Sequence, residues 1–143
     1  MALKKLNALV VDDSGLMRKS VIQTLKKSKV AEFVFVEAAD GEKALKKFSP
    51  GKFHVIFADW NMPNMTGIDL VHRIRKGKKD TKVKIIMVTS EKRVGKLQEA
   101  LDKAGADGYV CKPFTVEDFQ SKLTPILATV EVGGSWIKKL IGG

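Results

Sequence analysis

Residues 8–25 read ALVVDDSGLMRKSVIQTL, and this stretch indicates the fold class. It begins with a short apolar run, Ala8–Val11, which has the length and the branched side chains of a buried strand. Two aspartates follow, and apolar residues then recur at a helical spacing at Leu16, Val21, Ile22 and Leu25. A buried strand that leads directly into a helix is the repeating unit of α/β folds with parallel strands.

The alternation of strand and helix signals continues along the chain. Further strands are expected at Phe33–Glu37, Val55–Ala58, Lys84–Val88 and Gly108–Cys111, each followed by a helical pattern. Right-handed crossovers limit five such units to a few topologies, and the flavodoxin-like order 2-1-3-4-5 is the commonest for this size. We therefore predict an α/β fold: a single doubly wound domain with a five-stranded parallel sheet and five helices.

Local signals predict where three of the helices begin or end. Thr115 is followed three positions later by Asp118, which is the spacing of a capping box at the start of the fifth helix. Gly77 and Gly105 lie where the third and fourth helical patterns stop, and glycine is typical of helix ends because it adopts the left-handed conformation at little cost.

Length and composition exclude several classes of protein. A chain of 143 residues can bury one core without disulfides. No apolar run approaches the ~20 residues that cross a bilayer, and none resembles a signal peptide, so we expect a cytoplasmic monomer with no stable membrane association. The one cysteine, Cys111, has no cysteine or histidine near it to hold zinc and is expected to be an ordinary strand residue.

The net charge of +10 suggests either a solvated basic face or an anionic partner. The densest basic stretch is residues 73–84, which hold seven cations against one acid, Asp80. No aromatic residue interleaves there to stack on bases, so nucleic acid is not expected as a partner. A solvated face and an acidic protein partner both remain open.

Polar residues follow four of the predicted strands at their carboxyl ends: Asp12 and Asp13 follow the first, Asp59 the third, Thr89 the fourth and Lys112 the fifth. The carboxyl ends of parallel strands form one crevice at the topological switch point, so these side chains should converge. Oxygen ligands without histidine or thiolate select a hard cation. The sequence therefore predicts a Mg²⁺ site, in which Mn²⁺ could substitute.

Three carboxylates in one crevice would repel one another unless a cation keeps them ionised. With the cation bound, one oxygen of Asp59 is free to act as a nucleophile toward a phosphoryl group. Phosphoryl transfer mainly needs positioning and charge neutralisation, which the metal, Lys112 and Thr89 would supply. The Lys112–Pro113 bond is a candidate for the cis isomer, since X-Pro bonds adopt it far more readily than others.

Four stretches resemble the receiver domain of bacterial response regulators: LVVDDSGLMRK, FADWNMPNMTGIDL, IIMVTSE and GADGYVCKPF. The resemblance covers about residues 3–128, and the run DWNMPNMTG resembles the chemotaxis members of the family, the CheY type. It implies a histidine kinase as phosphoryl donor. It also implies an output face on the fourth helix, fifth strand and fifth helix, for a flagellar motor switch protein or a phosphatase.

The resemblance also implies a role for individual residues. Asp59 would be the phosphoacceptor, with Lys112 and Thr89 binding the phosphoryl group. The metal set would be Asp12, Asp13, Asp59 and the backbone carbonyl of Asn61. Thr89 and Tyr109 would form the switch pair, and Asn61 and Glu91 would tune dephosphorylation.

These implications predict a signalling protein rather than an enzyme: a stand-alone response regulator in chemotaxis and flagellar motor control. The alternative within the family is a phosphate sink or shuttle without a motor partner. A metal-dependent phosphatase would need a cap or substrate pocket, and the chain has no insertion large enough to form one. A DNA-binding regulator would need a helix-turn-helix after Ala128, and none follows.

The chain divides into a receiver domain, residues 1–128, and a C-terminal tail, residues 129–143. In the tail Ser135 is a candidate N-cap, and four apolar residues would share one face of a short amphipathic helix: Trp136, Ile137, Leu140 and Ile141. So short a helix is marginal alone in water. A frayed end, a docking element and a contact with a membrane surface all remain open.

Overall fold

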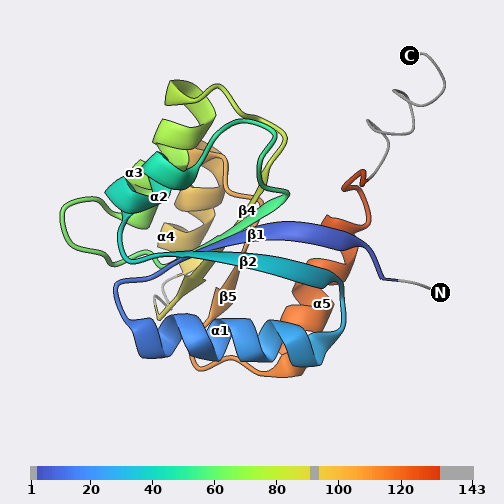
Figure 1. The fold of residues 1–143 in the computed structure, drawn as a ribbon. Helices are drawn as coiled ribbons and strands as arrows, with labels where there is room; N and C mark the ends of the chain where they lie inside the picture. Colours follow the sequence, from blue (N-terminus) through green and yellow to red (C-terminus); the bar gives the residue numbers. More distant parts are fainter. Residues whose placement is uncertain (1–2, 91–93, 133–143) are drawn as a thin grey trace, which may run out of the picture.

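The computed structural model describes residues 3–90 and 94–132, in which strands and helices alternate along the chain (Figure 1). The strands are β1 (Lys5–Val11), β2 (Glu32–Ala38), β3 (Val55–Ala58), β4 (Lys84–Thr89) and β5 (Gly108–Cys111). The helices are α1 (Gly15–Ser28), α2 (Gly41–Lys47), α3 (Gly67–His72), α4 (Val94–Glu99) and α5 (Val116–Leu127). Wider π-helical turns extend α3 and α4: η1 (Arg73–Gly77) and η2 (Ala100–Ala104).

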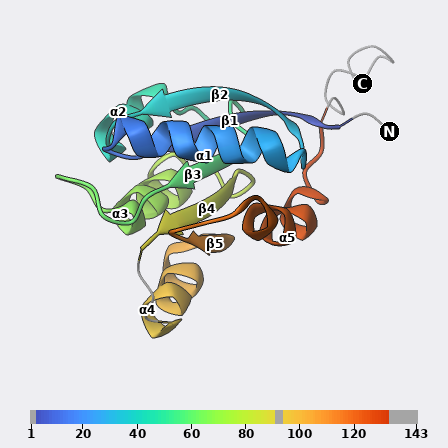
Figure 2. The ribbon, with the colours of Figure 1, turned by 90° about the horizontal axis from the view of Figure 1, so that it is seen from below.

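All five strands are parallel, in the order β2-β1-β3-β4-β5. In Figure 1, α1 and α5 lie below the sheet, and α2, α3 and α4 lie above it. Figure 2, turned by 90°, shows the sheet running from β2 at one edge to β5 at the other. The predicted α/β fold and strand order are therefore confirmed.

Each face of the sheet has its own core. Alternate residues of the strands face opposite sides, so Leu9 packs toward α2 and α3, while Ala8 packs toward α1 and α5. The central strand β3 is buried on both faces, as expected for a parallel sheet covered by helices. On the α5 side, the rings of Phe57 and Phe119 meet edge to face at 6.2 Å.

Four helices begin with a side-chain cap just after a strand or loop at the carboxyl edge of the sheet. Ser14, Asp40, Thr66 and Thr115 each accept a backbone N–H from the residue three positions on. At α5 the Asp118 carboxylate also accepts the N–H of Thr115, which completes the predicted capping box. These caps fix short connections and place the helix N-termini at the edge where the candidate site lies.

The predicted helix ends are confirmed at Gly105, which caps η2 with φ of 89°, and at Gly77, the last residue of η1. The expectation that Leu16 shares the apolar stripe of α1 is wrong, because its side chain is 81% exposed. Leu16 is five residues from Val21, which at 100° per residue turns it roughly 140° away from the buried side.

The described chain ends beside its own beginning. The ammonium group of Lys4 donates to the carbonyls of Leu127, Ala128 and Val130 at 3.0, 3.2 and 2.9 Å, so it closes the end of α5 onto the start of β1. The predicted tail helix at 135–141 lies outside the described residues, as does Glu91. No helix within the described ranges is long and apolar enough to span a membrane.

Candidate functional site

Strand register brings the candidate residues to one level of the sheet. The paired residues at the carboxyl ends are Val11 with Ala58, Ala58 with Met87, and Thr89 with Cys111. Asp12 and Asp59 directly follow the first pair, and Lys112 follows Cys111. The backbone N–H of Asp59 donates to the carbonyl of Val11 at 3.0 Å, which continues the sheet pairing into the site.

Three carboxylates meet at this edge. Asp12, Asp13 and Asp59 each offer an oxygen that lies within 4.8 Å of the others. Asp12 is 4% exposed and Asp59 is 8% exposed, while Asp13 is open to solvent. One oxygen of Asp12 accepts the backbone N–H of Ser14 at 2.9 Å, which fixes the carboxylate at the start of α1.

Lys112 reaches this cluster from β5. Its ammonium nitrogen lies 3.2 Å from an oxygen of Asp12 and 3.4 Å from an oxygen of Asp59. The Lys112–Pro113 bond is cis, as the sequence suggested. The backbone N–H of Lys112 donates to the carbonyl of Thr89 at 2.8 Å, and Thr89 is fully buried.

The surroundings of Asp59 disfavour its charged form. Burial raises the pKa of its carboxyl group, and the nearby charge of Asp12 adds to the rise. The Lys112 ammonium and a hydrogen bond from the backbone N–H of Asn61 lower the pKa in part. Among the described residues, one ammonium group faces three carboxylates, which leaves the cluster short of positive charge.

This donor set fits a hard divalent cation. All of its side-chain donors are carboxylate oxygens, which are the ligands that Mg²⁺ and Mn²⁺ prefer. The exposure of Asp13 leaves room for the waters that Mg²⁺ retains. A divalent ion would supply the positive charge that Lys112 alone does not.

The structure places the remaining predicted residues as follows. Tyr109 lies on β5 opposite Met87 of β4 and is half buried, with the ammonium of Lys122 4.9 Å from its ring centroid. Asn61 follows Asp59 by two positions and has an exposed side chain. Thr89 and Tyr109 therefore lie on neighbouring strands.

Arg18 is a site neighbour that sequence reasoning missed. From α1 it donates to the backbone carbonyl of Asp12 at 2.6 Å and pairs with Glu37 of β2 at 2.9 Å. It thus holds the end of β1 against β2 and α1. An arginine six positions after an aspartate gives no sequence signal for this contact, because the contact depends on the turn between strand and helix.

Gly67 is a second missed residue. A Cβ atom at this position would lie 2.3 Å from the carbonyl oxygen of Asp59 and 2.6 Å from the terminal carbon of Met87. Its N–H donates to the carbonyl of Trp60 at 2.8 Å, so the loop after Asp59 folds back onto the strand end. Only a residue without a side chain allows this approach.

Comparisons with known proteins agree with this geometry. The family model described as "Response regulator receiver domain" matches residues 8–124. The chain is 37% identical to the chemotaxis protein CheY of Pseudomonas aeruginosa and 38% identical to the chemotaxis protein CheY1 of Helicobacter pylori. Each match spans 122 residues, which is 85% of this chain and 96% of the relative.

A solved structure agrees as well. The chemotaxis protein CheY4 of Vibrio cholerae superposes with a TM-score of 0.73 at 35% identity, and the match covers 88% of this chain and all of CheY4. The family match, the relatives and the acidic edge all point to one conclusion. The chain belongs to the response regulator receiver domain family.

Proposed function

We propose that this chain is a stand-alone response regulator that accepts a phosphoryl group on Asp59 from a histidine kinase. The observation that carries the proposal is the position of the Asp59 carboxylate. It lies 3.4 Å from the Lys112 ammonium, in a group of three carboxylates whose oxygens are within 4.8 Å of one another. A nucleophile beside a cation and a metal-binding group is what phosphoryl transfer requires.

The metal-binding residues in this proposal are Asp12, Asp13, Asp59 and the backbone carbonyl of Asn61. When bound, Mg²⁺ supplies charge neutralisation for the carboxylates and for the oxygens of the incoming phosphoryl group. The oxygen-only donor set supports Mg²⁺ over zinc.

The chemical step is a direct displacement at phosphorus. A carboxylate oxygen of Asp59 forms a bond to phosphorus while the bond from phosphorus to the donor's histidine nitrogen breaks, and the nitrogen keeps that electron pair. Lys112 holds one phosphoryl oxygen, and the hydroxyl of Thr89 donates to another. Asn61 and Glu91 would set the rate of the slow, Mg²⁺-dependent hydrolysis that resets the protein.

Thr89 and Tyr109 would transmit the effect of phosphorylation to the partner-binding face. Phosphorylation adds about 1.5 to 2 negative charges, which draw Thr89 toward Asp59 and leave space for the Tyr109 ring. Both residues connect to the face formed by α4, β5 and α5, where we place the partner. The names of the relatives support a chemotaxis role. In that role the partner on this face would be a flagellar motor switch protein or a phosphatase. A phosphate sink or shuttle is the alternative.

In this proposal residues 1–128 are the receiver domain and residues 129–143 are an appended tail. The protein acts as a cytoplasmic monomer and not as an enzyme with a separate substrate. The contacts of Lys4 with Leu127, Ala128 and Val130 support a domain boundary near residue 128, because the chain is fastened there.

Tryptophan fluorescence tests the proposal. Trp60 directly follows Asp59, so its emission should respond to Mg²⁺ and then to a small phosphoryl donor such as acetyl phosphate. A Trp136→Phe background isolates the Trp60 signal, and Asp59→Asn is the matched control. We expect a saturable Mg²⁺ response and a second, donor-dependent response that Asp59→Asn abolishes. Mg²⁺ binding without a donor response would reject the phosphoacceptor role.

A further inference from the structure

The amino end of the sheet carries lysines that phosphoryl transfer does not use. The helices run opposite to the strands, and two helical segments end towards this edge with basic last turns: Lys26 and Lys27 in α1, and Lys76 in η1. Positive charge at a helix C-terminus is favourable because of the helix dipole. The dipole therefore accounts for part of the basic charge.

The lysines fall into two groups: the side chains of some bond to carbonyls of the protein, and the side chains of others do not. Lys4 donates to the carbonyls at the end of α5, and Lys47 donates to the carbonyl of Glu37 at 2.5 Å. By contrast, three lysines at the end of α1 have side chains that form no hydrogen bond or ion pair within residues 3–90 and 94–132: Lys26, Lys27 and Lys29. Their ammonium groups are open to a ligand.

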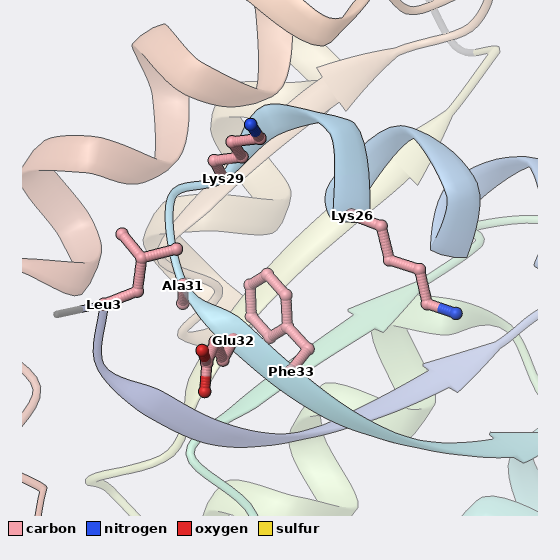
Figure 3. Close-up of a pocket in the computed structure, with 6 residues that line it drawn as sticks. All are labelled: Leu3, Lys26, Lys29, Ala31, Glu32 and Phe33. Carbon is pink, nitrogen blue, oxygen red and sulfur yellow. The ribbon is translucent and has the colours of Figure 1, made fainter.

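A pocket of about 240 Å³ lies directly beside these lysines (Figure 3). It is lined by Leu3, Lys26, Lys29, Ala31, Glu32 and Phe33. Leu3 is 40% exposed and Phe33 is half buried, so the pocket has an accessible apolar floor. Its one acidic lining residue, Glu32, has the exposed Lys5 as its register partner on β1. The pocket thus combines apolar surface with a positive rim.

The pocket lies beside an edge strand of the sheet. β2 is an edge strand in the described five-stranded sheet, and its first two residues, Glu32 and Phe33, line the pocket. An edge strand offers backbone N–H and C=O groups to an incoming extended segment. An extended peptide therefore has both side-chain and backbone partners here.

We propose that this pocket binds an acidic, extended segment of a partner protein. One apolar side chain would pack against Leu3, Ala31 and Phe33, and carboxylates beside it would pair with Lys26 and Lys29. The length of β1 separates this pocket from the Asp12 and Asp59 edge by roughly 20 Å. The interaction is thus distinct from phosphoryl transfer and does not rest on it.

The charge and the lining of the pocket favour an acidic peptide over a second copy of the chain or a nucleic acid. A second copy of the chain would bring another net charge of +10 to the same basic edge, which opposes self-association. Binding of a nucleic acid strand by stacking uses several aromatic rings, whereas the lining of the pocket holds one, that of Phe33. Carboxylates next to an apolar anchor match both features of the pocket.

The test uses the full chain and a fluorescein-labelled synthetic peptide in which one phenylalanine is flanked on both sides by glutamates. Fluorescence anisotropy measures affinity, and amide chemical shifts in ¹⁵N-labelled protein locate the contact. We expect shifts at Lys26, Lys29, Glu32 and Phe33. Peptides with serine in place of phenylalanine, or lysine in place of the glutamates, should bind more weakly. Absence of shifts at these residues at saturating peptide would overturn the proposal.

Two lysines provide a matched pair of variants. Lys29 and Lys79 have the positive φ values 55° and 57°, which glycine adopts more easily, so Lys29→Gly and Lys79→Gly each remove one charge without disturbing the fold. Lys79 does not line the pocket. We expect Lys29→Gly to weaken peptide binding about two- to fivefold and Lys79→Gly to leave it unchanged. Equal weakening by both variants would indicate general charge attraction and contradict a site.

The same anisotropy assay tests the other ligands that could occupy the pocket. Anionic phospholipid vesicles and a single-stranded oligonucleotide should compete poorly with the peptide. If either binds more tightly than the peptide, and Lys29→Gly weakens that binding, the proposal of an acidic protein partner is wrong. Removing residues 133–143 should leave peptide affinity unchanged. Peptide binding that appears only after this removal would assign the pocket to the chain's own end and reject the proposal.

Discussion

Asp59 at the carboxyl end of the sheet and Asp80 at the amino end are buried to a similar degree, 8% and 6% exposed, yet they differ in what they face. The carboxylate of Asp80 accepts the backbone N–H groups of Lys82 and Val83 at 2.8 and 3.0 Å. Asp59 accepts one backbone N–H, that of Asn61, but its charged neighbours are the side chains of Lys112 and Asp12. A buried charge held by backbone groups alone stabilises a loop, whereas one that also faces charged side chains can change its partners.

The same contrast applies to the cations. Near the amino end, Arg75 donates to the carbonyls of Gly105, Asp80 and Val83 and pairs with Asp107 at 2.9 Å, which fastens η1 to the loops before β4 and β5. Within residues 3–90 and 94–132, the partners of the Lys112 ammonium group at the carboxyl end are carboxylates. Arg75 thus fastens the loops around it, whereas the ammonium group of Lys112 is held by side chains that can also bind a ligand.

The largest expected effect concerns the close backbone approach at the carboxyl end. Gly67→Ala should lower the free energy of unfolding by about 3 kcal/mol, because its Cβ would overlap the Asp59 carbonyl at 2.3 Å. Gly95→Ala is the matched control. A Cβ there meets nothing within 4 Å, so stability should stay the same or rise. Equal losses in urea denaturation for both variants would refute this packing argument.

Lys112→Met should lower the rate of phosphorylation by acetyl phosphate about a hundredfold, the usual effect of removing a group that binds charge in the transition state. The same change should strengthen Mg²⁺ binding, because the ammonium lies 3.2 and 3.4 Å from two of the carboxylates and repels a cation. Lys78→Met, an exposed lysine at the other end, should change neither quantity. Weaker Mg²⁺ binding in Lys112→Met would contradict the charge argument.

The two buried aspartates should respond oppositely to the same substitution. Asp80→Asn should cost about 1 to 2 kcal/mol of stability, since it weakens charge-assisted bonds to two backbone N–H groups. Asp59→Asn, measured without Mg²⁺ at neutral pH, should raise stability, because burial and Asp12 disfavour the ionised form. Thermal unfolding of both variants checks this contrast. A loss of stability in Asp59→Asn would contradict this expectation, because it would mean that the Lys112 ammonium already offsets the negative charge of the carboxylates.

These predictions also show which residues of the fold and the site could be predicted from the sequence and which could not. Asp12, Asp59 and Lys112 were predictable, because strand periodicity and parallel topology place their strand ends side by side. Arg75 was not, since it stands in the densest basic stretch of the chain and only the folded loops show that it binds three carbonyls. Gly67 was missed for a similar reason: the close approach to Asp59 depends on the path of the loop.

The smallest expected effect is a pH dependence at the amino end. Burial lowers the pKa of His54, whose Nδ1 accepts the backbone N–H of Asn7 at 2.8 Å. Because the folded pKa lies below the unfolded value of about 6.5, the unfolded state binds more protons as the pH falls below that value. Stability should therefore decrease slightly in mildly acidic buffer.

His54→Gln supplies the control for this pH dependence, because glutamine can accept a hydrogen bond but does not titrate. Urea denaturation at neutral and mildly acidic pH should show a smaller decrease in the variant than in the original protein. An identical decrease in both would assign the acid sensitivity to other groups.

The most direct test of the account is the mass of the intact protein after incubation with Mg²⁺ and acetyl phosphate. We expect the mass of one phosphoryl group to be added, to be absent in Asp59→Asn, and to be absent when a chelator removes Mg²⁺. Asp80→Asn should still gain the group, since its carboxylate serves the loop at the other end of the sheet. A mass gain that persists in Asp59→Asn, or no gain in the original protein, would contradict Asp59 as the phosphoryl acceptor.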